Sequence, residues 1–133
     1  MEDKIDILEK NVDELQEIVD GLTVIDKLAS KTPELVKNFE QLQMEELLLF
    51  CKKNLDYGTR NITKGLDMSK DANVWFIAVS LWTRISDKIN RWQTALLNGE
   101  SMQVKDESIL DTLQDISNYC NIAQLIYRGM WKE

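Results

Sequence analysis

The feature that most limits how this chain can fold is its scarcity of residues that break helices. The 133 residues include one proline, Pro33, and only five glycines. Sandwiches and barrels need many turns, which use glycine and proline, so an all-β fold is disfavoured. Between the breakers, apolar residues recur every three or four positions over long stretches, as they do on one face of an α-helix. The sequence therefore predicts an all-α fold.

The breakers divide the chain into long helical segments joined by short polar stretches. We expect helices at residues 3–29, 33–55, 72–97 and 105–130. Thr32 is a suitable N-cap for the second helix, and Pro33 fits its first position. The predicted architecture is a four-helix bundle-like domain with an N-terminal amphipathic helix. We expect residues 1–133 to form a single domain, with a heptad-like helix over 1–30 and a core bundle over 33–130.

The N-terminal helix carries apolar residues that alternate by three and four positions, as in the seam of a coiled coil. These residues are Ile5, Leu8, Val12, Leu15, Val19 and Leu22. Asp26 occupies the next a-type position, so the repeat lasts about three heptads. The seam could pair with another subunit or dock on the chain's own bundle, and the sequence leaves both open.

The other helices each show an apolar stripe that we expect to be buried. In the second helix it comprises Leu35, Phe39, Leu42 and residues 47–50. In the third it comprises Val74, Ala78, Leu81, Ile85, Ile89, Trp92 and Leu96, broadened by Trp75, Phe76 and Trp82. In the last it comprises Ile109, Leu113, Ile116, Cys120, Ala123 and Tyr127. Cys51 and Cys120 stand alone in apolar segments and form no disulfide framework, so we expect both to be buried.

A row of acids marks the other side of the last helix. Glu107, Asp111 and Asp115 are spaced at i, i+4 and i+8, and Asn118 lies close beside them. Like charges at this spacing repel each other, so the row calls for compensation. A divalent cation such as Mg²⁺, which prefers carboxylate oxygens, would provide it. A solvated acidic face is the alternative.

The third helix carries a row of cations in an otherwise acidic protein. Arg84, Lys88 and Arg91 fall on one flank, with Asp87 adjacent. The row could neutralise a phosphorylated ligand or form an ordinary solvated flank. The polar connection before this helix is about fifteen residues long, and a connection of that length is uncommon in a compact domain unless it carries function.

Composition excludes several classes of function. The net charge of −7 disfavours binding to a nucleic-acid backbone. Because the chain has no histidine, Ser-His-Asp and Cys-His triads and histidine-ligated zinc are excluded. The longest apolar runs are too short to cross a bilayer, and no signal peptide is evident at the N-terminus. We therefore expect no membrane partner and a cytoplasmic location, in a bacterium or a phage-infected host cell.

Three blocks of the sequence together resemble the nucleotide modification associated domain family, type 1, which is common in phages and their bacterial hosts. The blocks are Lys53-Asn-Leu-Asp56-Tyr57-Gly58, Arg84 to Arg91, and Val104 to Tyr119. The resemblance covers residues 40–125 approximately, and the family is distantly similar to the all-alpha NTP pyrophosphatases, the group that contains MazG and the dimeric dUTPases. It implies that fold type and a small nucleotide as the ligand.

The resemblance implies Mg²⁺-dependent (or Mn²⁺-dependent) hydrolysis of a nucleoside triphosphate to monophosphate and pyrophosphate. The metal ligands would be Asp87, Glu107, Asp111 and Asp115, with Glu107 and Asp111 catalytic. The nucleotide and its phosphates would be bound by Lys53, Asp56, Tyr57, Gly58, Arg84, Lys88, Arg91 and Asn118. The pyrophosphatases carry ExxE and ExxD, whereas this chain has Arg84-x-x-Asp87 and Glu107-x-x-x-Asp111. The metal site could therefore be rearranged, reduced to one ion or lost.

Two other functions remain open at the level of sequence. The chain could bind a nucleotide without catalysis, for example to sequester a nucleotide signal, because cations and aromatic side chains suffice for binding. It could also be a helical interaction module whose charges are merely solvated. Because the related pyrophosphatases generally assemble as dimers or tetramers, we also expect a homo-oligomer.

Overall fold

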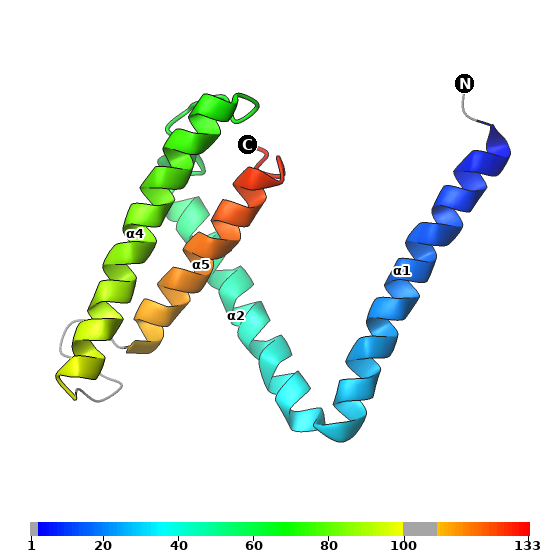
Figure 1. Ribbon diagram of the computed structural model, residues 1–133, viewed down its shortest axis with the longest axis horizontal. Helices are drawn as coiled ribbons and strands as arrows, with labels where there is room; N and C mark the ends of the chain where they lie inside the picture. Colours follow the sequence, from blue (N-terminus) through cyan, green and yellow to red (C-terminus); the bar gives the residue numbers. More distant parts are fainter. Residues whose placement is uncertain (1–2, 100–108) are drawn as a thin grey trace. The chain divides into compact units, whose positions relative to one another are not determined.

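The computed structural model describes residues 3–99 and 109–133. Within these ranges the chain is helical and has no strand, which confirms the all-α prediction (Figure 1). The helices are α1 (Lys4–Lys31), α2 (Pro33–Tyr57), α3 (Arg60–Thr63), α4 (Asp71–Leu97) and α5 (Ile109–Tyr127). The chain divides into two compact units, the N-terminal unit (Met1–Glu45) and the C-terminal unit (Glu46–Glu133), and the boundary falls inside α2. No helix in the described ranges is both long and apolar enough to span a membrane.

The N-terminal unit consists of α1 and the first part of α2. The Asp3 carboxylate caps α1 by accepting a hydrogen bond from the Ile5 backbone N–H (3.5 Å). Pro33 begins α2 as expected, and the Thr32 hydroxyl donates to the Leu28 carbonyl oxygen (3.2 Å). No residue of α1 is buried. The apolar seam of α1 is therefore exposed on the helix surface.

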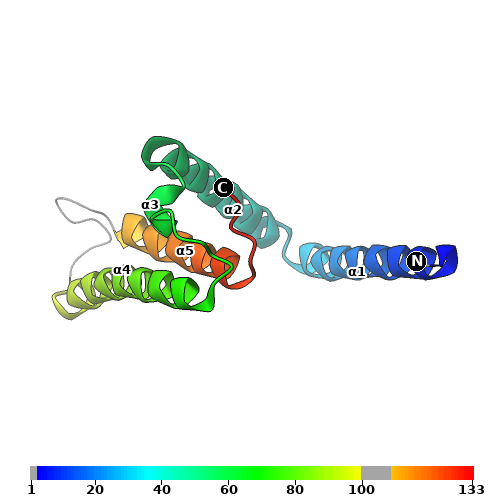
Figure 2. The ribbon, with the colours of Figure 1, turned by 90° about the horizontal axis from the view of Figure 1, so that it is seen from above.

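The C-terminal unit has a compact hydrophobic core. Helix α5 packs against α4, and the end of α2 lies along another side of α5 (Figure 2). The core contains Ile62, Ile77, Leu81, Ile122 and Ile126. Phe50 and Trp131 pack against this cluster. Their two rings meet edge to face, with ring centroids 5.9 Å apart. Side chains from α2, α3, α4, α5 and the C-terminal segment thus converge on one core.

Several predicted core positions are wrong. The aromatic residues expected to be buried on α4 are largely solvent-exposed, with Trp75 and Trp82 at 67% and 68%. Helix α2 has no buried residue, and both cysteines are exposed. Among the described elements, α5 is the main packing neighbour of α4, so only one face of α4 is covered. Apolar periodicity marked the correct helices but overestimated how much of each is buried.

The buried face of α5 is also turned away from the predicted stripe. Its buried residues are Thr112, Asn118, Ile122 and Ile126, whereas Cys120 and Tyr127 are exposed. The helix therefore directs the polar side chains of Asp115 and Asn118 inward. Such an orientation is stable where buried polar groups find hydrogen-bonding partners, and Asp115 finds them on two neighbouring helices.

The long connection between α2 and α4 is ordered by its own short helix, α3. Ile62 and Thr63 of α3 are buried, and the Thr63 hydroxyl donates to the Glu133 carboxylate. Beyond α3, the Asp67 carboxylate accepts hydrogen bonds from the Ser69 hydroxyl (2.7 Å) and backbone N–H (2.9 Å). These hydrogen bonds lower the pKa of Asp67. The connection is thus a packed part of the C-terminal unit.

Candidate functional site

Asp115 joins three helices of the C-terminal unit through two ion pairs. One carboxylate oxygen accepts from the Lys53 ammonium of α2 at 2.7 Å, and the other accepts from the Lys88 ammonium of α4 at 2.9 Å. The Asp115 side chain is 18% exposed, so both pairs are only partly screened by water. The sequence predicted that acids of the last helix would face cations of the third, and the contact between Asp115 and Lys88 has that geometry.

The protonation of Asp115 reflects two opposing influences. Burial alone would raise its pKa, because it disfavours the charged form. The hydrogen bonds from Lys53 and Lys88 and their positive charges outweigh burial, so the pKa of Asp115 lies below its ordinary value. The carboxylate is therefore ionised at neutral pH and compensated by two ammonium groups.

A pocket of about 390 Å³ opens beside this ion-paired cluster. Its lining includes a lysine, an arginine, two tyrosines and three asparagines, and none of the described residues in it is acidic. The lining residues are Lys53, Asn54, Tyr57, Gly58, Asn61, Ile62, Arg84, Asn118, Tyr119 and Ile122. Its volume is within the range of small-ligand pockets. The pocket is thus a cationic, amide-rich and aromatic hollow in an acidic chain.

The end of α2 forms one wall of the pocket. The Gly58 backbone N–H donates to the Asn54 carbonyl oxygen (3.0 Å), and Gly58 has a positive φ of 78°. This is the glycine-terminated helix end that a residue with a side chain adopts only under strain. Tyr57, the last residue of α2, remains 71% exposed, so its ring is accessible at the mouth of the pocket.

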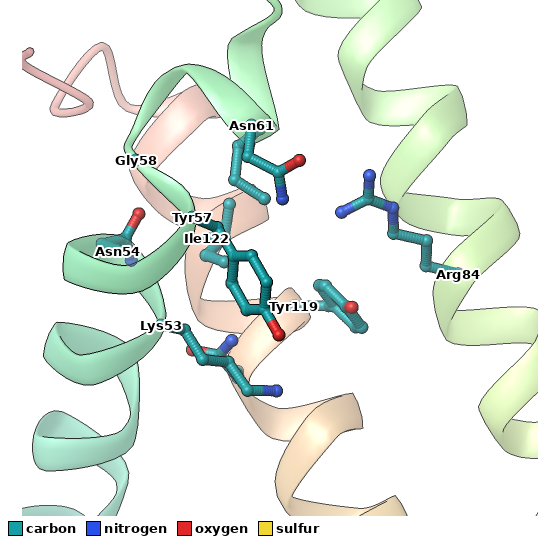
Figure 3. A pocket seen from close by; sticks show the side chains of 10 residues that line it. Lys53, Asn54, Tyr57, Gly58, Asn61, Arg84, Tyr119 and Ile122 are labelled. Carbon is teal, nitrogen blue, oxygen red and sulfur yellow. The ribbon is translucent and has the colours of Figure 1, made fainter.

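Arg84 of α4 and Tyr119 of α5 form the opposite wall. The Arg84 guanidinium carbon is 5.7 Å from the centre of the Tyr119 ring, a cation–π arrangement. Figure 3 shows the Arg84 side chain extending from α4 toward Asn61 and Tyr57 on the opposite wall. The contact with Tyr119 orients the arginine across the pocket, so that its N–H groups can donate to a ligand.

The pocket gathers part of the predicted binding set. It contains five of the eight predicted residues, namely Lys53, Tyr57, Gly58, Arg84 and Asn118. Asp56, Lys88 and Arg91 are not among the lining residues. Lys88 pairs with Asp115, which in turn pairs with the lining residue Lys53. Sequence reasoning missed several wall residues. Tyr119 could have been found because it follows Asp115 by four positions and so shares its face of α5. No motif or periodic pattern in the sequence pointed to Asn61 in α3.

The predicted metal ligands do not form a site among the described residues. Asp87 and Asp111 are exposed, and Glu107 lies outside the described ranges. Nor does any group of three acidic or cysteine side chains suited to a metal occur within those ranges. Both Asp115 oxygens already accept from lysine ammoniums, so a cation would have to displace two positive charges. The Mg²⁺ or Mn²⁺ site thus remains a prediction, because Glu107, one of its four predicted ligands, lies outside the described ranges.

Comparison with known proteins assigns no family to the chain. No family model, no curated protein and no solved structure matches it.

Proposed function

We propose that the C-terminal unit binds a small phosphorylated nucleotide in the pocket between α2, α4 and α5, without metal-dependent hydrolysis by the described residues. The observation that carries this proposal is the composition of the pocket wall, which combines Lys53 and Arg84 with two tyrosines and lacks an acid among its described residues. The three sequence blocks that resemble a nucleotide-associated family each contribute to this wall. The resemblance and the pocket geometry therefore support the same ligand class.

Phosphate recognition in this proposal falls to the two cations. Arg84 offers a planar set of N–H donors that suits phosphate oxygens, and its ring contact with Tyr119 holds it in place. The Lys53 ammonium lies on the other wall and donates to the Asp115 carboxylate at 2.7 Å. A local pair of cations reverses the repulsion that a chain of net charge −7 would otherwise exert on an anion.

Base recognition falls to the aromatic and amide groups. Tyr57 and Tyr119 present rings on different walls, and each could stack on a base whatever its identity. Amides such as those of Asn61 and Asn118 both donate and accept hydrogen bonds, which suits the edge of a base. Asn118 lines the pocket and is 6% exposed.

The first test is nucleotide binding by calorimetry, with EDTA present and then with Mg²⁺. The probes are the common ribonucleoside and deoxyribonucleoside mono- and triphosphates, with free nucleosides as phosphate-free controls. We expect at least one phosphorylated probe to bind in EDTA and its nucleoside to bind more weakly. Binding that requires Mg²⁺, together with release of pyrophosphate, would replace the proposal with hydrolysis. Failure of every probe to bind would overturn it.

Two tyrosines of almost equal exposure provide a matched pair of variants. Tyr57 in the pocket wall is 71% exposed, and Tyr127 outside it is 69% exposed. Tyr57→Ala should weaken binding by roughly 5-fold to 150-fold, since stacking on an aromatic ring contributes about 1–3 kcal/mol per base. Tyr127→Ala should leave the affinity unchanged. Equal effects of the two substitutions would show that the pocket is misassigned.

Asp115→Asn distinguishes the two roles proposed for this carboxylate by the sign of its effect. If Asp115 neutralises Lys53, its replacement frees the ammonium for phosphate and binding tightens by about 3-fold, as expected for removing one charge about 6 Å away in water. If Asp115 holds a metal, the variant loses both nucleotide binding and the response to Mg²⁺. Calorimetric titration of one phosphorylated probe measures either outcome.

A further inference from the structure

The apolar seam of α1 has an internal order beyond its three-four spacing. Its a positions carry only β-branched residues, and its d positions carry only leucine. The a residues are Ile5, Val12 and Val19, and the d residues are Leu8, Leu15 and Leu22. All of them are more than half exposed, and no residue of α1 is buried. Contiguous apolar surface of this kind on a soluble chain marks an interaction site.

The alternation of residue types specifies the kind of partner. β-branched residues at a with leucine at d favour a parallel, two-stranded coiled coil over larger assemblies. A seam with this order is complementary to itself, because each a residue packs beside the same residue of an identical helix in register. Ile18 and Ile25 fall at g positions and widen the seam on one side.

The charges beside the seam agree with a parallel arrangement. In a parallel pair, each g residue faces the e residue five positions later on the other helix. Lys4 at g would therefore face Glu9 at e of a second copy, an attractive pair. Asn11 and Gln16 form the next such pair and add no repulsion.

Asp26 sets the limit of the seam. It occupies the a position after Leu22, where two copies would bring like charges together. The paired region is therefore residues 5–22, about 27 Å of helix.

We propose that α1 binds a second copy of this chain through residues 5–22, forming a parallel two-stranded coiled coil. The inference is independent of the nucleotide pocket, whose described residues all belong to the C-terminal unit. It defines an interaction surface and its partner.

The test uses the full chain in analytical ultracentrifugation over a range of concentrations. Wild-type protein should be a concentration-dependent dimer. Val12→Glu places a charge in the seam and should convert the dimer to monomer at the same concentration. Lys10→Glu introduces the same side chain on the outer face of the helix, alters the net charge by more, and should leave the dimer intact. Circular dichroism of both variants checks that helical content is retained.

Cross-linking tests the direction of the helices. In a Cys51→Ser, Cys120→Ser background, Ile5→Cys should form a disulfide-linked dimer under mild oxidation, because parallel helices place the two copies of position 5 together. A monomer at all concentrations, or a dimer that Val12→Glu leaves intact, would overturn the proposal. So would a trimer or tetramer, or an Ile5→Cys dimer that does not cross-link, because each contradicts a parallel two-stranded pair.

Discussion

Helices α1 and α5 are both amphipathic, yet they differ in how much of each is buried. Helix α1 buries none of its residues, whereas α5 buries Thr112, Asn118, Ile122 and Ile126. The more regular apolar pattern belongs to α1, and the helix with polar groups on its inner face belongs to the core. A helix is buried when its neighbours offer both apolar contact and hydrogen-bonding partners. Periodicity shows that a face needs a partner, but it does not show which partner.

Hydrogen exchange should show the largest difference between these helices. Backbone amides of α5 near Ile122 are expected to exchange only in global unfolding, whereas those of α1 can exchange by local opening when the protein is dilute. We expect protection about 100-fold or more higher in α5 under such conditions. Exchange followed by mass spectrometry measures it. Raising the protein concentration should increase protection in α1 alone, and equal protection at high dilution would contradict the comparison.

Truncation of core and seam residues should separate the two kinds of stability. Ile122 is 2% exposed, so Ile122→Ala should lower the free energy of unfolding by about 2–4 kcal/mol. Leu15→Ala, in the seam, should instead lower only the part of the unfolding free energy that increases with protein concentration. Urea denaturation at two protein concentrations distinguishes the cases. A large, concentration-independent loss for Leu15→Ala would mean that α1 belongs to a core within its own chain.

Acidification should weaken the C-terminal unit through Asp115. The folded-state pKa of this group is lowered, so its stabilisation is complete above the unfolded-state pKa of about 3.9 and is lost as the pH falls through the folded-state value. Asp115→Asn should cost about 1–2 kcal/mol at neutral pH, since it removes the charged carboxylate that both ammoniums contact. The difference in unfolding free energy between wild type and variant should shrink below pH 4 approximately. Urea denaturation of both proteins at several pH values measures this difference, and a difference that does not change with pH would contradict the prediction.

Gly21→Ala should give the smallest effect. Gly21 lies on the outer side of α1, and a methyl group added there meets nothing within 4 Å. The substitution should raise the stability of the helix by up to about 1 kcal/mol, because glycine is a poor helix former. Circular dichroism during thermal unfolding would detect it. The dimer stoichiometry should not change, and a change would show that the outer face also takes part in contacts.

The helices were largely predictable because their signals are local. Proline at the start of α2 and Asn98-Gly99 at the end of α4 act on the backbone within one turn, and both boundaries were found. The burial of Trp75 and Trp82 was predicted incorrectly because burial depends on neighbours far away in the sequence. The order within the long connection was missed for the same reason, since the buried Thr63 takes its hydrogen-bond partner from the C-terminal residue Glu133.

Part of the pocket lining was selected from the sequence, but its arrangement was not. Lys53, Arg84 and Asn118 were selected from separate sequence blocks, and all three line one pocket. The sequence could not show that Asp115 accepts from two lysines, because one of them is 62 residues away along the chain. Through that contact, Asp115 pairs with Lys53, which lines the pocket.

By itself, the amino-acid sequence determined that the described part of this protein is helical and where α1, α2 and α4 begin and end to within two residues. It also determined which residue types lie along each face, because backbone propensity and periodicity are properties of short segments. The predicted last helix, 105–130, extends three residues past the end of α5 at Tyr127, and its predicted start lies outside the described residues. Only the tertiary structure decided which face of α5 turns inward and which charges are paired, because those outcomes depend on what neighbouring helices offer. In the C-terminal unit, Lys53 and Lys88 compensate the carboxylate that α5 turns inward. Helix α1, by contrast, has no buried residue within the described ranges.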